Sequence, residues 1–423
     1  MVNPRFFYTL GLWLLLPYVF FHLLWRARKQ PEYLRHIGER FGFYGTRGNQ
    51  PIIWLHAVSV GETRAAASLV RRLRESYPQH QLLLTHTTPT GRAAGEQLYG
   101  SGVLRVYLPY DYPFAVRRFL RHFQPSIGVL LETEIWFNLI HSCYTASVPL
   151  LLLNARLSEK SAARYARYPN LAKGGLDDLA AIAAQTENDA ARLVALGAAK
   201  VSVMGNLKFD IEPPPATLEL GKRLRGQFGA NRKIFLAAST REGEEALLLD
   251  AIAQAGIPEL LAVIVPRHPQ RFDEVAALLA QRNIRFQRRS ADQPVAADIR
   301  VVLGDSMGEM FAYYAACDLA FIGGSLLPFG GQNLIEACIV GKPVIIGPHT
   351  YNFAQAGQSA VECGAAVRVQ DSASLAQTLR QMISEPERMA ESGKAGRRFV
   401  SASLGATERA LHLISLSIEN TGH

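Results

Sequence analysis

Residues 52–63 read IIWLHAVSVGET, a short apolar run followed by a turn-forming segment and then by the start of a helical stretch. A near-continuous apolar run of this kind is typical of a parallel strand, because such a strand is buried on both faces of its sheet. The same succession of apolar run, turn and helical stretch recurs along most of the chain. It predicts repeated β-loop-α units and hence an α/β fold with doubly wound parallel sheets.

The predicted strands form two groups on either side of a proline-rich segment. The first group comprises residues 52–57, 82–85, 127–131, 149–153, 179–184 and 201–204, and the second comprises 234–238, 260–265, 299–303, 319–322 and 344–346. Residues 211–215 end in three consecutive prolines, which predict a semi-rigid linker and exclude a helix or a central strand there. We therefore expect two Rossmann-like domains whose ligand-binding strand ends face an interdomain cleft.

The chain accordingly divides into four expected parts. These are a membrane anchor at residues 1–30, an N-terminal domain at 31–210, a linker at 211–216 and a C-terminal domain at 217–423. The final helix of the C-terminal domain could pack back on the N-terminal domain.

Residues 6–25, FFYTLGLWLLLPYVFFHLLW, carry no formal charge and are long enough for a helix that crosses the hydrocarbon core of a membrane. Pro17 and interfacial aromatic residues such as Trp13 and Trp25 also suit a helix that lies partly in one leaflet, so both arrangements stay open. Several cations follow the run directly, and by the positive-inside rule the rest of the chain stays in the cytoplasm. A cleaved signal peptide and a buried core helix are the less favoured alternatives.

Composition and charge limit both the class of protein and the kind of partner that this sequence allows. The 423 residues are 48% hydrophobic and 19% charged, which excludes a disordered, collagen-like or disulfide-scaffold protein. Residues 1–206 carry 23 basic and 13 acidic side chains, a net charge of +10, whereas the remainder is near neutral. We expect an anionic partner at the N-terminal half. The four cysteines lie far apart and the histidines show no metal-ligand spacing, so we expect a reduced, metal-free protein that faces the cytosol.

Acidic residues stand where two predicted strands give way to helices. Ser59-x-x-Glu62 has the spacing of a capping box, in which Glu62 would bond back to the Ser59 amide and stabilise the helix start. Glu132 and Glu134 follow the apolar strand 127–131, either as solvated acids at a helix start or as a base or hydroxyl-binding group. Spacing alone favours the capping role for Glu62 and leaves both roles open for the acids after strand 127–131.

Glycine pairs bracket a loop in the second half of the chain. Gly323-Gly324 ends a predicted strand, and Gly330-Gly331 precedes a helix that we expect to begin near Asn333 and to direct its amides at a phosphate. Asn333-x-x-Glu336 again fits a cap and its partner, and Ser306-x-x-Glu309 is a third sequence with this spacing. Two glycine pairs that bracket a loop at a strand end are a more specific sign of a ligand-binding loop than a lone G-x-G.

Two basic residues stand at turns beside predicted strands. Arg267 follows the strand 260–265, and Lys208 lies just before the proline linker. Either could neutralise a leaving phosphate, and a solvated surface charge is the alternative for both.

Motifs in order along nearly the whole chain give it a family resemblance. They are GERFG at 38–42, SVGE at 59–62, ETEIW at 132–136, NARLS at 154–158, GNLKFD at 205–210, STREGEE at 239–245, VPRHP at 265–269, MGEM at 307–310 and GGQNLIEA at 330–337. With them the chain resembles the 3-deoxy-D-manno-octulosonic acid (Kdo) transferases of lipopolysaccharide synthesis, which are GT-B glycosyltransferases of family 30.

The resemblance implies an inverting transfer of Kdo from CMP-Kdo to a lipid A precursor, lipid IVA, without a metal or other cofactor. It places the protein at the bacterial inner membrane, with its catalytic domains on the cytoplasmic side. The N-terminal domain would bind the acceptor and the C-terminal domain CMP-Kdo. Its partners would be these two substrates and inner-membrane lipids.

The resemblance also assigns residues. The general base falls on Glu62 and a second required acid on Glu132. The CMP-binding residues fall on Pro266, Arg267, Met307, Gly308, Glu309, Asn333, Leu334, Ile335 and Glu336, with Gly330, Gly331 and Lys208 as support for the phosphate leaving group. Within that set Glu336 would hold the ribose hydroxyls and residues 307–309 the cytosine. Gln332 and Phe137 stand where family members commonly have His and Pro, so the roles of these two side chains stay open.

Two other functions fit parts of the sequence. One is a GT-B transferase that uses a UDP-sugar and a lipid-linked acceptor; binding of CMP rather than UDP would exclude it. The other is a membrane-tethered nucleotide-binding protein without catalysis, which would need the glycine loops but not Glu62 and Glu132. We expect no nucleic-acid partner, because the cations are scattered and no basic-aromatic stripe is present.

Overall fold

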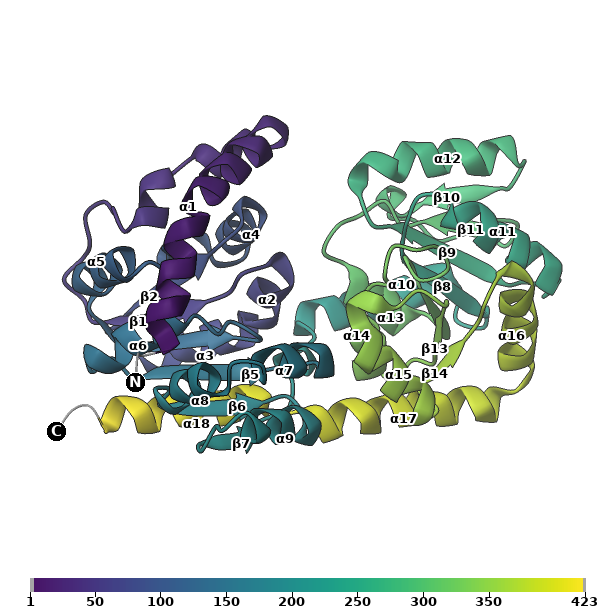
Figure 1. Ribbon diagram of the computed structural model, residues 1–423. Coiled ribbons are helices and arrows are strands. Elements are labelled where there is room, and N and C mark those ends of the chain that lie inside the picture. The colour runs from purple at the N-terminus through teal and green to yellow at the C-terminus, as the bar shows by residue number, and fades with distance from the viewer. Residues whose placement is uncertain (1–3, 421–423) are drawn as a thin grey trace. The chain divides into compact units, whose positions relative to one another are not determined.

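The computed structural model describes residues 4–420, and the chain forms two compact units. Unit 1 extends to Asp210 and takes in the chain again from Ser403, whereas unit 2 is Ile211–Ala402. Each unit is built on one seven-stranded parallel sheet (Figure 1). The two doubly wound α/β sheets predicted from the apolar runs are thus confirmed.

Unit 1 has the strand order β3-β2-β1-β4-β5-β6-β7. Its strands are β1 (Ile52–His56), β2 (Gln81–His86), β3 (Leu104–Tyr107), β4 (Pro125–Leu131), β5 (Leu150–Ala155), β6 (Ala181–Ala184) and β7 (Val201–Val203). Its helices are α1 (Pro4–Lys29), α2 (Val60–Ala65), α3 (Ala67–Ser76), α4 (Pro89–Tyr99), α5 (Pro113–Phe123), α6 (Phe137–Thr145), α7 (Glu159–Tyr165), α8 (Pro169–Asp177), α9 (Glu187–Ala195) and α18 (Ala406–Glu419).

Unit 2 has the strand order β10-β11-β9-β8-β12-β13-β14. Its strands are β8 (Ile234–Thr240), β9 (Leu261–Pro266), β10 (Phe286–Arg288), β11 (Val301–Leu303), β12 (Leu319–Ile322), β13 (Val344–Ile346) and β14 (Ala366–Arg368). Its helices are α10 (Pro215–Phe228), α11 (Glu244–Ala255), α12 (Phe272–Gln281), α13 (Met310–Ala316), α14 (Ile335–Ile339), α15 (Ala354–Glu362), α16 (Ser372–Ser384) and α17 (Pro386–Ser403), at whose end the chain returns to unit 1.

Alternate residues of the central strands supply the two faces of each core. In β1, Ile53 and Leu55 belong to one buried cluster, and Trp54 belongs to the cluster on the other face of the sheet. A parallel strand covered by helices on both sides needs apolar residues at every position, which is why its sequence lacks polar alternation.

Three strands have no apolar run in the sequence that predicts them, and all three lie at sheet edges. They are β3, β10 and β14, at the outer positions of their sheets. Each is three or four residues long and carries an arginine. An edge strand is short and only partly covered, so it has no continuous apolar run to mark it.

The proline-rich segment also differs from expectation. Pro215 is the first residue of α10, with Pro214 at its N-cap, so the exclusion of helix from residues 211–215 was wrong at its last position. Proline is favoured at the first position of a helix because the N–H that it lacks would have no helical partner there.

The chain from Ser403 belongs to unit 1, so unit 2 ends earlier than residue 423. Helix α18 buries Ala406, Ala410 and Ile414 in the same cluster as β1 and β4. At the edge of this cluster, the Tyr77 hydroxyl lies 2.7 Å from the Ser415 hydroxyl of α18. The last helix is therefore a structural part of unit 1.

Helix α1, drawn in purple in Figure 1, is the one helix among residues 4–420 that is long and apolar enough to cross a membrane. It is attached to unit 1 by polar contacts: the Tyr8 hydroxyl donates to Asp111 Oδ2 (2.8 Å), and the Tyr112 hydroxyl donates to the Leu12 carbonyl (2.9 Å). Its other face is exposed and apolar, with Leu14 75% exposed and Phe21 69% exposed.

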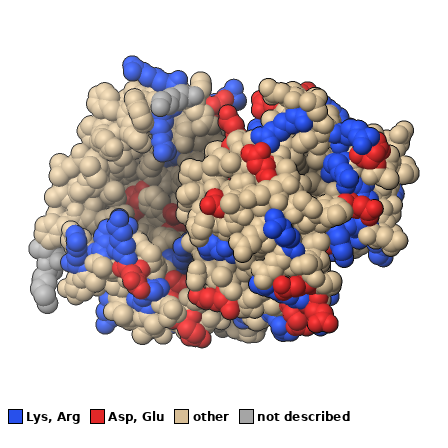
Figure 2. Space-filling model, turned by 90° about the vertical axis from the view of Figure 1, so that its right-hand side faces the viewer, with Lys and Arg blue, Asp and Glu red and all other residues tan. Residues whose placement is uncertain are grey.

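On the face drawn in Figure 2, basic and acidic side chains are interspersed, and many lie beside a residue of opposite sign.

Candidate active site

An acidic cluster lies at the carboxyl ends of two neighbouring strands of unit 1. Strand β1 pairs in parallel with β4, so both strands end at the same edge of the sheet. The turn after β1 leads into α2 with Glu62, and the segment after β4 carries Glu132 and Glu134. The structure thus brings Glu62 to the same sheet edge as two acids that follow about seventy residues later in the chain. In doubly wound sheets, ligands bind beyond these strand ends.

The Glu62 carboxylate accepts two hydrogen bonds from the segment before α2. The Val58 amide donates to Oε2 (2.8 Å) and the Ser59 hydroxyl donates to Oε1 (2.8 Å), while Ser59 Oγ accepts from the Glu62 amide (3.3 Å). Ser59 is the N-cap, as predicted, but Glu62 bonds back to the Val58 amide and not to the Ser59 amide. Glu62 is therefore a capping residue in the structure, held in one orientation.

Burial raises the pKa of Glu62 to about 7, against the opposing effect of its two hydrogen bonds and with a further increase from the Glu132 and Glu134 carboxylates. An acid that serves only as an exposed cap has its pKa lowered, because the amide it binds favours the charged form. Glu62 instead titrates near neutral pH, where a carboxylate is the most effective general base.

Glu132 has a strained backbone and a cationic partner. Its φ of 62° lies in the left-handed region, which a residue with a long side chain seldom adopts. The Lys208 ammonium donates to Glu132 Oε1 at 3.0 Å. Strain of this kind costs roughly 1–3 kcal/mol and is concentrated at functional sites. Lys208, expected to support the leaving phosphate, is thus paired with the acidic cluster of its own unit.

Glu134 and His56 complete the cluster. The Trp136 indole donates to Glu134 Oε2 at 2.6 Å, and His56 Nε2 lies 3.9 Å from the same oxygen. Burial lowers the pKa of His56 to about 3, so its ring is neutral and the pair is not an ion pair. No role could be predicted for His56, because nothing along the chain marks a buried strand residue as the neighbour of an acid.

In unit 2, the first glycine pair follows β12 and is fastened by a buried acid. Glu244, at the start of α11, accepts the amides of Gly324 (2.5 Å) and Leu326 (3.0 Å). A Cβ on Gly323 would lie 2.4 Å from the Ser239 carbonyl, so only glycine fits at that position. Glu244 lies in the motif STREGEE at residues 239–245, but the family resemblance assigned it no role. Its hydrogen bonds show that it positions the loop that follows β12.

The second glycine pair leads to α14, which begins near Asn333 as predicted: its N-cap is Leu334 and its first residue is Ile335. Asn333 Oδ1 accepts the Ile335 amide (3.0 Å), and Asn333 Nδ2 donates to Glu336 Oε1 (3.2 Å). Leu334 and Ile335 are each 1% exposed, so they can offer a ligand only their backbone.

Arg267 lies at the end of β9, directly after the buried Pro266. Its Nε donates to Gln332 Oε1 at 3.2 Å, which joins the Val265–Pro269 turn to the segment after Gly330 and Gly331. Both glycines have positive φ, 90° and 74°, a backbone conformation that other residues adopt only under strain. Gln332 thus has a definite structural partner among the predicted donor-site residues.

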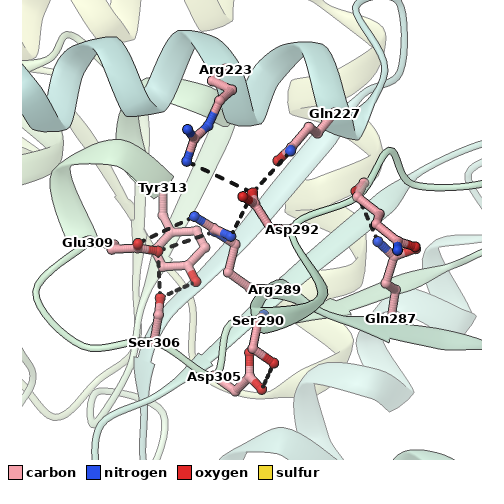
Figure 3. Close-up of polar contacts among 11 residues, drawn as sticks. Arg223, Gln227, Gln287, Arg289, Ser290, Asp292, Asp305, Ser306, Glu309 and Tyr313 are labelled. Carbon is pink, nitrogen blue, oxygen red and sulfur yellow. Dashed lines mark hydrogen bonds and ion pairs between the residues drawn. The ribbon is translucent and has the colours of Figure 1, made fainter.

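Glu309 belongs to a polar network at the carboxyl end of β11 (Figure 3). Arg289 Nε lies 3.2 Å from Glu309 Oε2, and the Ser306 hydroxyl donates to the same oxygen at 2.7 Å. Ser306 also lies 2.7 Å from the Tyr313 hydroxyl. Glu309 itself occupies the N-cap position of α13, so the interpretation of Ser306-x-x-Glu309 as a third capping box was wrong.

Met307 and Gly308 form the tip of the same turn. The Met307 side chain is 55% exposed, and Gly308 has a φ of 79° with no atom near the position of a Cβ. The backbone of this turn is therefore open to a ligand. A metal site has no comparable set of candidate residues. Residues 4–420 contain no group of three His, Cys, Asp or Glu side chains placed to hold a metal ion.

Comparisons with known proteins agree with this arrangement. Residues 35–211 match the family described as 3-Deoxy-D-manno-octulosonic-acid transferase (kdotransferase), and residues 233–399 match Glycosyl transferases group 1. The chain is 43% identical over 420 residues to the 3-deoxy-D-manno-octulosonic acid transferase of Bordetella pertussis, covering 96% of this chain and 97% of that protein. It is 36% identical to the enzyme of the same name from Haemophilus influenzae, covering 98% and 99%.

Among solved structures, Anabaena Alr3699/HepE in complex with UDP has a TM-score of 0.55 at 18% identity, covering 86% of this chain and 99% of that one. The likeness shows the fold, which is the two-domain GT-B architecture. From the identity to its relatives over nearly its whole length, the chain belongs to the 3-deoxy-D-manno-octulosonic acid (Kdo) transferase family and is a glycosyltransferase of lipopolysaccharide synthesis.

Proposed function

We propose that this enzyme transfers Kdo from CMP-Kdo to the phosphorylated glucosamine disaccharide of a lipid A precursor, with inversion at the anomeric carbon and without a metal ion. The observation that carries the proposal is Glu62, a carboxylate fixed by two hydrogen bonds at a strand end whose pKa is raised to about 7. A general base needs both a fixed direction and a pKa near the working pH.

In the proposed step, Glu62 takes the proton of an acceptor hydroxyl as the hydroxyl oxygen forms a bond to the anomeric carbon of Kdo. The bond from that carbon to the phosphate oxygen of CMP breaks, and its electron pair stays on the phosphate. Attack opposite to the leaving group accounts for inversion. Glu132 and its Lys208 partner stand beside the base, and we assign Lys208 to limiting the negative charge of the acidic cluster.

Unit 2 would hold the donor. The predicted CMP-binding residues lie at or after the carboxyl ends of β9, β11 and β12, and the last of them belong to the start of α14; these strands are neighbours or near neighbours in one sheet. Arg267 and the backbone amides after Gly330 and Gly331 would stabilise the charge that develops on the phosphate, in the place of a metal. Glu336 would bind ribose hydroxyls and the turn at Met307–Glu309 the cytosine.

Helix α1 would attach the enzyme to the cytoplasmic face of the inner membrane. Contacts from Tyr8, Thr9 and Leu12 hold its first half against unit 1. Its opposite face exposes apolar side chains along the helix. A helix fastened to a folded unit along one side suits a position in the interface of one leaflet better than a span across both.

The proposed function is tested by measuring the transfer of Kdo directly. Purified enzyme, CMP-Kdo and a tetraacylated, bisphosphorylated glucosamine disaccharide should yield a product heavier by Kdo, measured by mass spectrometry. Glu62→Gln should lower the rate by roughly 100-fold to 10,000-fold, the usual contribution of a general base. The exposed Glu96→Gln is the matched control and should retain full activity. Near-normal transfer by Glu62→Gln would refute the base assignment.

The donor nucleotide has a separate test. CMP at about 100 times its dissociation constant should stabilise the protein by about 2.7 kcal/mol, which a thermal unfolding curve detects. UDP should give no comparable shift at the same concentration. Stabilisation by UDP alone would favour a UDP-sugar transferase.

A further inference from the structure

An apolar groove lies between α1 and the segment that contains α6, α7 and α8 of unit 1. Its volume is about 710 Å³, within the range of roughly 300–1,000 Å³ that is usual for small-molecule sites. Its walls include Phe7, Leu12 and Leu15 from α1, Phe137 from α6, Tyr165 from α7 and Leu171 from α8. The reaction described above leaves this groove without a role.

The α1 wall of the groove is held in place by the buried carboxylate of Asp111. Asp111 accepts the Tyr8 hydroxyl (2.8 Å) and the amides of Asn138 (3.1 Å) and Leu139 (2.7 Å), so it ties α1 to the start of α6. Thr9 adds a hydrogen bond to Asn138 Oδ1 at 3.0 Å. Because these bonds join α1 to the opposite wall, the groove is a feature of the folded unit.

Phe137 forms the wall between α1 and α7. Its ring meets those of Tyr8 (centroids 5.2 Å apart) and Tyr165 (6.3 Å) edge to face. It also packs on Gly175 of α8, where a Cβ would lie 2.5 Å from the Phe137 ring. This accounts for a side chain that the family resemblance left open, because the large ring fills a space that Gly175 provides.

The groove is joined to the acidic cluster by a short segment of chain. Residues 132–136 carry the acids Glu132 and Glu134, and the next residue is Phe137, so this loop continues directly into the groove wall. The charge of Glu134 contributes to the raised pKa of Tyr165 in the groove wall, and it also contributes to the raised pKa of Glu62. The loop that carries Glu132 and Glu134 therefore ends at a residue of the groove wall.

The chemistry of the groove is amphipathic. Its lining is mainly apolar, and Arg164 lies on its rim. A smaller adjoining hollow of about 210 Å³ is lined partly by Arg5 and by His141, which lies 2.8 Å from the Asp178 carboxylate in the same lining. It opens beside the exposed apolar face of α1, where Phe7 is 60% exposed. An apolar slot with cations at its border fits a fatty acyl chain that is attached to a phosphorylated sugar.

We propose that this groove binds one acyl chain of the acceptor glycolipid and so holds the acceptor hydroxyl at Glu62. The inference rests on the proposed function for the identity of the acceptor. Burial of the chain would contribute to acceptor binding and not to the chemical step, so its loss should raise KM with little effect on kcat.

Gly11 offers a direct test. It lines the groove, and no atom lies within 4 Å of the position of its Cβ, so Gly11→Phe places a ring in the open space without a clash at Cβ. The matched control is Leu14→Phe, on the exposed face of α1 and outside the groove lining. Gly11→Phe should raise KM for the tetraacylated acceptor at least tenfold. It should leave kcat/KM for the same disaccharide without acyl chains within twofold, and the control should change neither.

A second measurement does not depend on transfer. An acceptor with a photoactivatable diazirine on one acyl chain should label peptides that span residues 164–172, in competition with unlabelled acceptor. Gly11→Phe should reduce this label at least tenfold. Label confined to other segments would overturn the proposal. So would label competed equally by a phospholipid, which would mark a bulk-lipid site, and so would an unchanged KM in Gly11→Phe. If the wild type transfers nothing to either acceptor, the proposed function fails, and the label alone then decides the groove.

Discussion

Glu62 can be a helix cap or a catalytic base, and the pH dependence of stability separates the two. Burial raises its pKa from about 4.5 to about 7. Between these values the folded protein keeps a proton on Glu62 that the unfolded chain has lost, so stability decreases as pH rises through this range. A cap with a lowered pKa has the opposite effect, because it loses stability as pH falls. We predict that Glu62→Gln abolishes this decrease in stability between about pH 4.5 and about pH 7.

The size of the effect follows from the shift. One pKa unit corresponds to 1.36 kcal/mol, so a shift of this size amounts to about 3 kcal/mol once Glu62 is fully ionised. In a unit of this size each kcal/mol changes the Tm by about 2–4 °C, which makes the difference roughly 6–12 °C. The hydrogen bonds from the Val58 amide and the Ser59 hydroxyl lower the pKa of Glu62, so their effect on the charged form is already included in this shift.

The assay is calorimetry of the wild type and Glu62→Gln from pH 4.5 to 8.5. The Tm difference, Gln minus Glu, should increase up to about pH 7 and then level off. Asp371 is the matched cap: it is exposed, and hydrogen bonds from Ser374 lower its pKa. Asp371→Asn should therefore show a disadvantage that stays constant over this pH range, because a carboxyl whose pKa is lowered from 3.8 loses its stabilising effect only at still lower pH. A Tm difference for Glu62→Gln that stays flat, as expected for Asp371→Asn, would refute the raised pKa.

Two further predictions concern the surroundings of the base and of α1. Lys208→Met removes the cation beside Glu132, so the pKa of Glu62 should rise further and the acidic limb of the kcat/KM profile should move to higher pH; an unmoved limb would show that Lys208 has no electrostatic effect on the base. Tyr8→Phe removes a hydrogen bond to Asp111, whose pKa is raised to about 7 by burial; at about pH 8.5, where this carboxyl is mainly ionised, the substitution should cost about 1.5–3 kcal/mol in chemical denaturation, whereas a cost below about 0.5 kcal/mol would mean that Asp111 does not fasten α1.

The sequence predicted the central strands well and the ends of the sheets poorly. Strand β12 occupies the residues expected of it, 319–322, because a strand covered on both faces must be apolar throughout. Strand β14 has the sequence Ala-Val-Arg, which is no more apolar than many turns, and pairs along one side only. Edge strands owe their conformation to the neighbour they pair with, and a local pattern cannot reveal that neighbour.

The same contrast applies to the candidate site. Motifs and their order marked Glu62, Glu132 and the glycine loops as functional candidates. Spacing misidentified Ser306-x-x-Glu309 as a capping box, because an S-x-x-E sequence carries no information on where the helix begins. Glu244 had no assigned role, since its partners lie some eighty residues away in the chain.

Local composition and periodicity determined the α/β class, the two groups of strands, the apolar N-terminal helix and the cationic first half, because each depends on residues close together in the chain. The tertiary structure decided which groups meet. It set three acids at one sheet edge, paired Lys208 with Glu132, tied α1 to Asp111 and packed α18 on unit 1. It also decided the chemistry of Glu62, because desolvation and the field of distant charges arise only when the chain has folded around them.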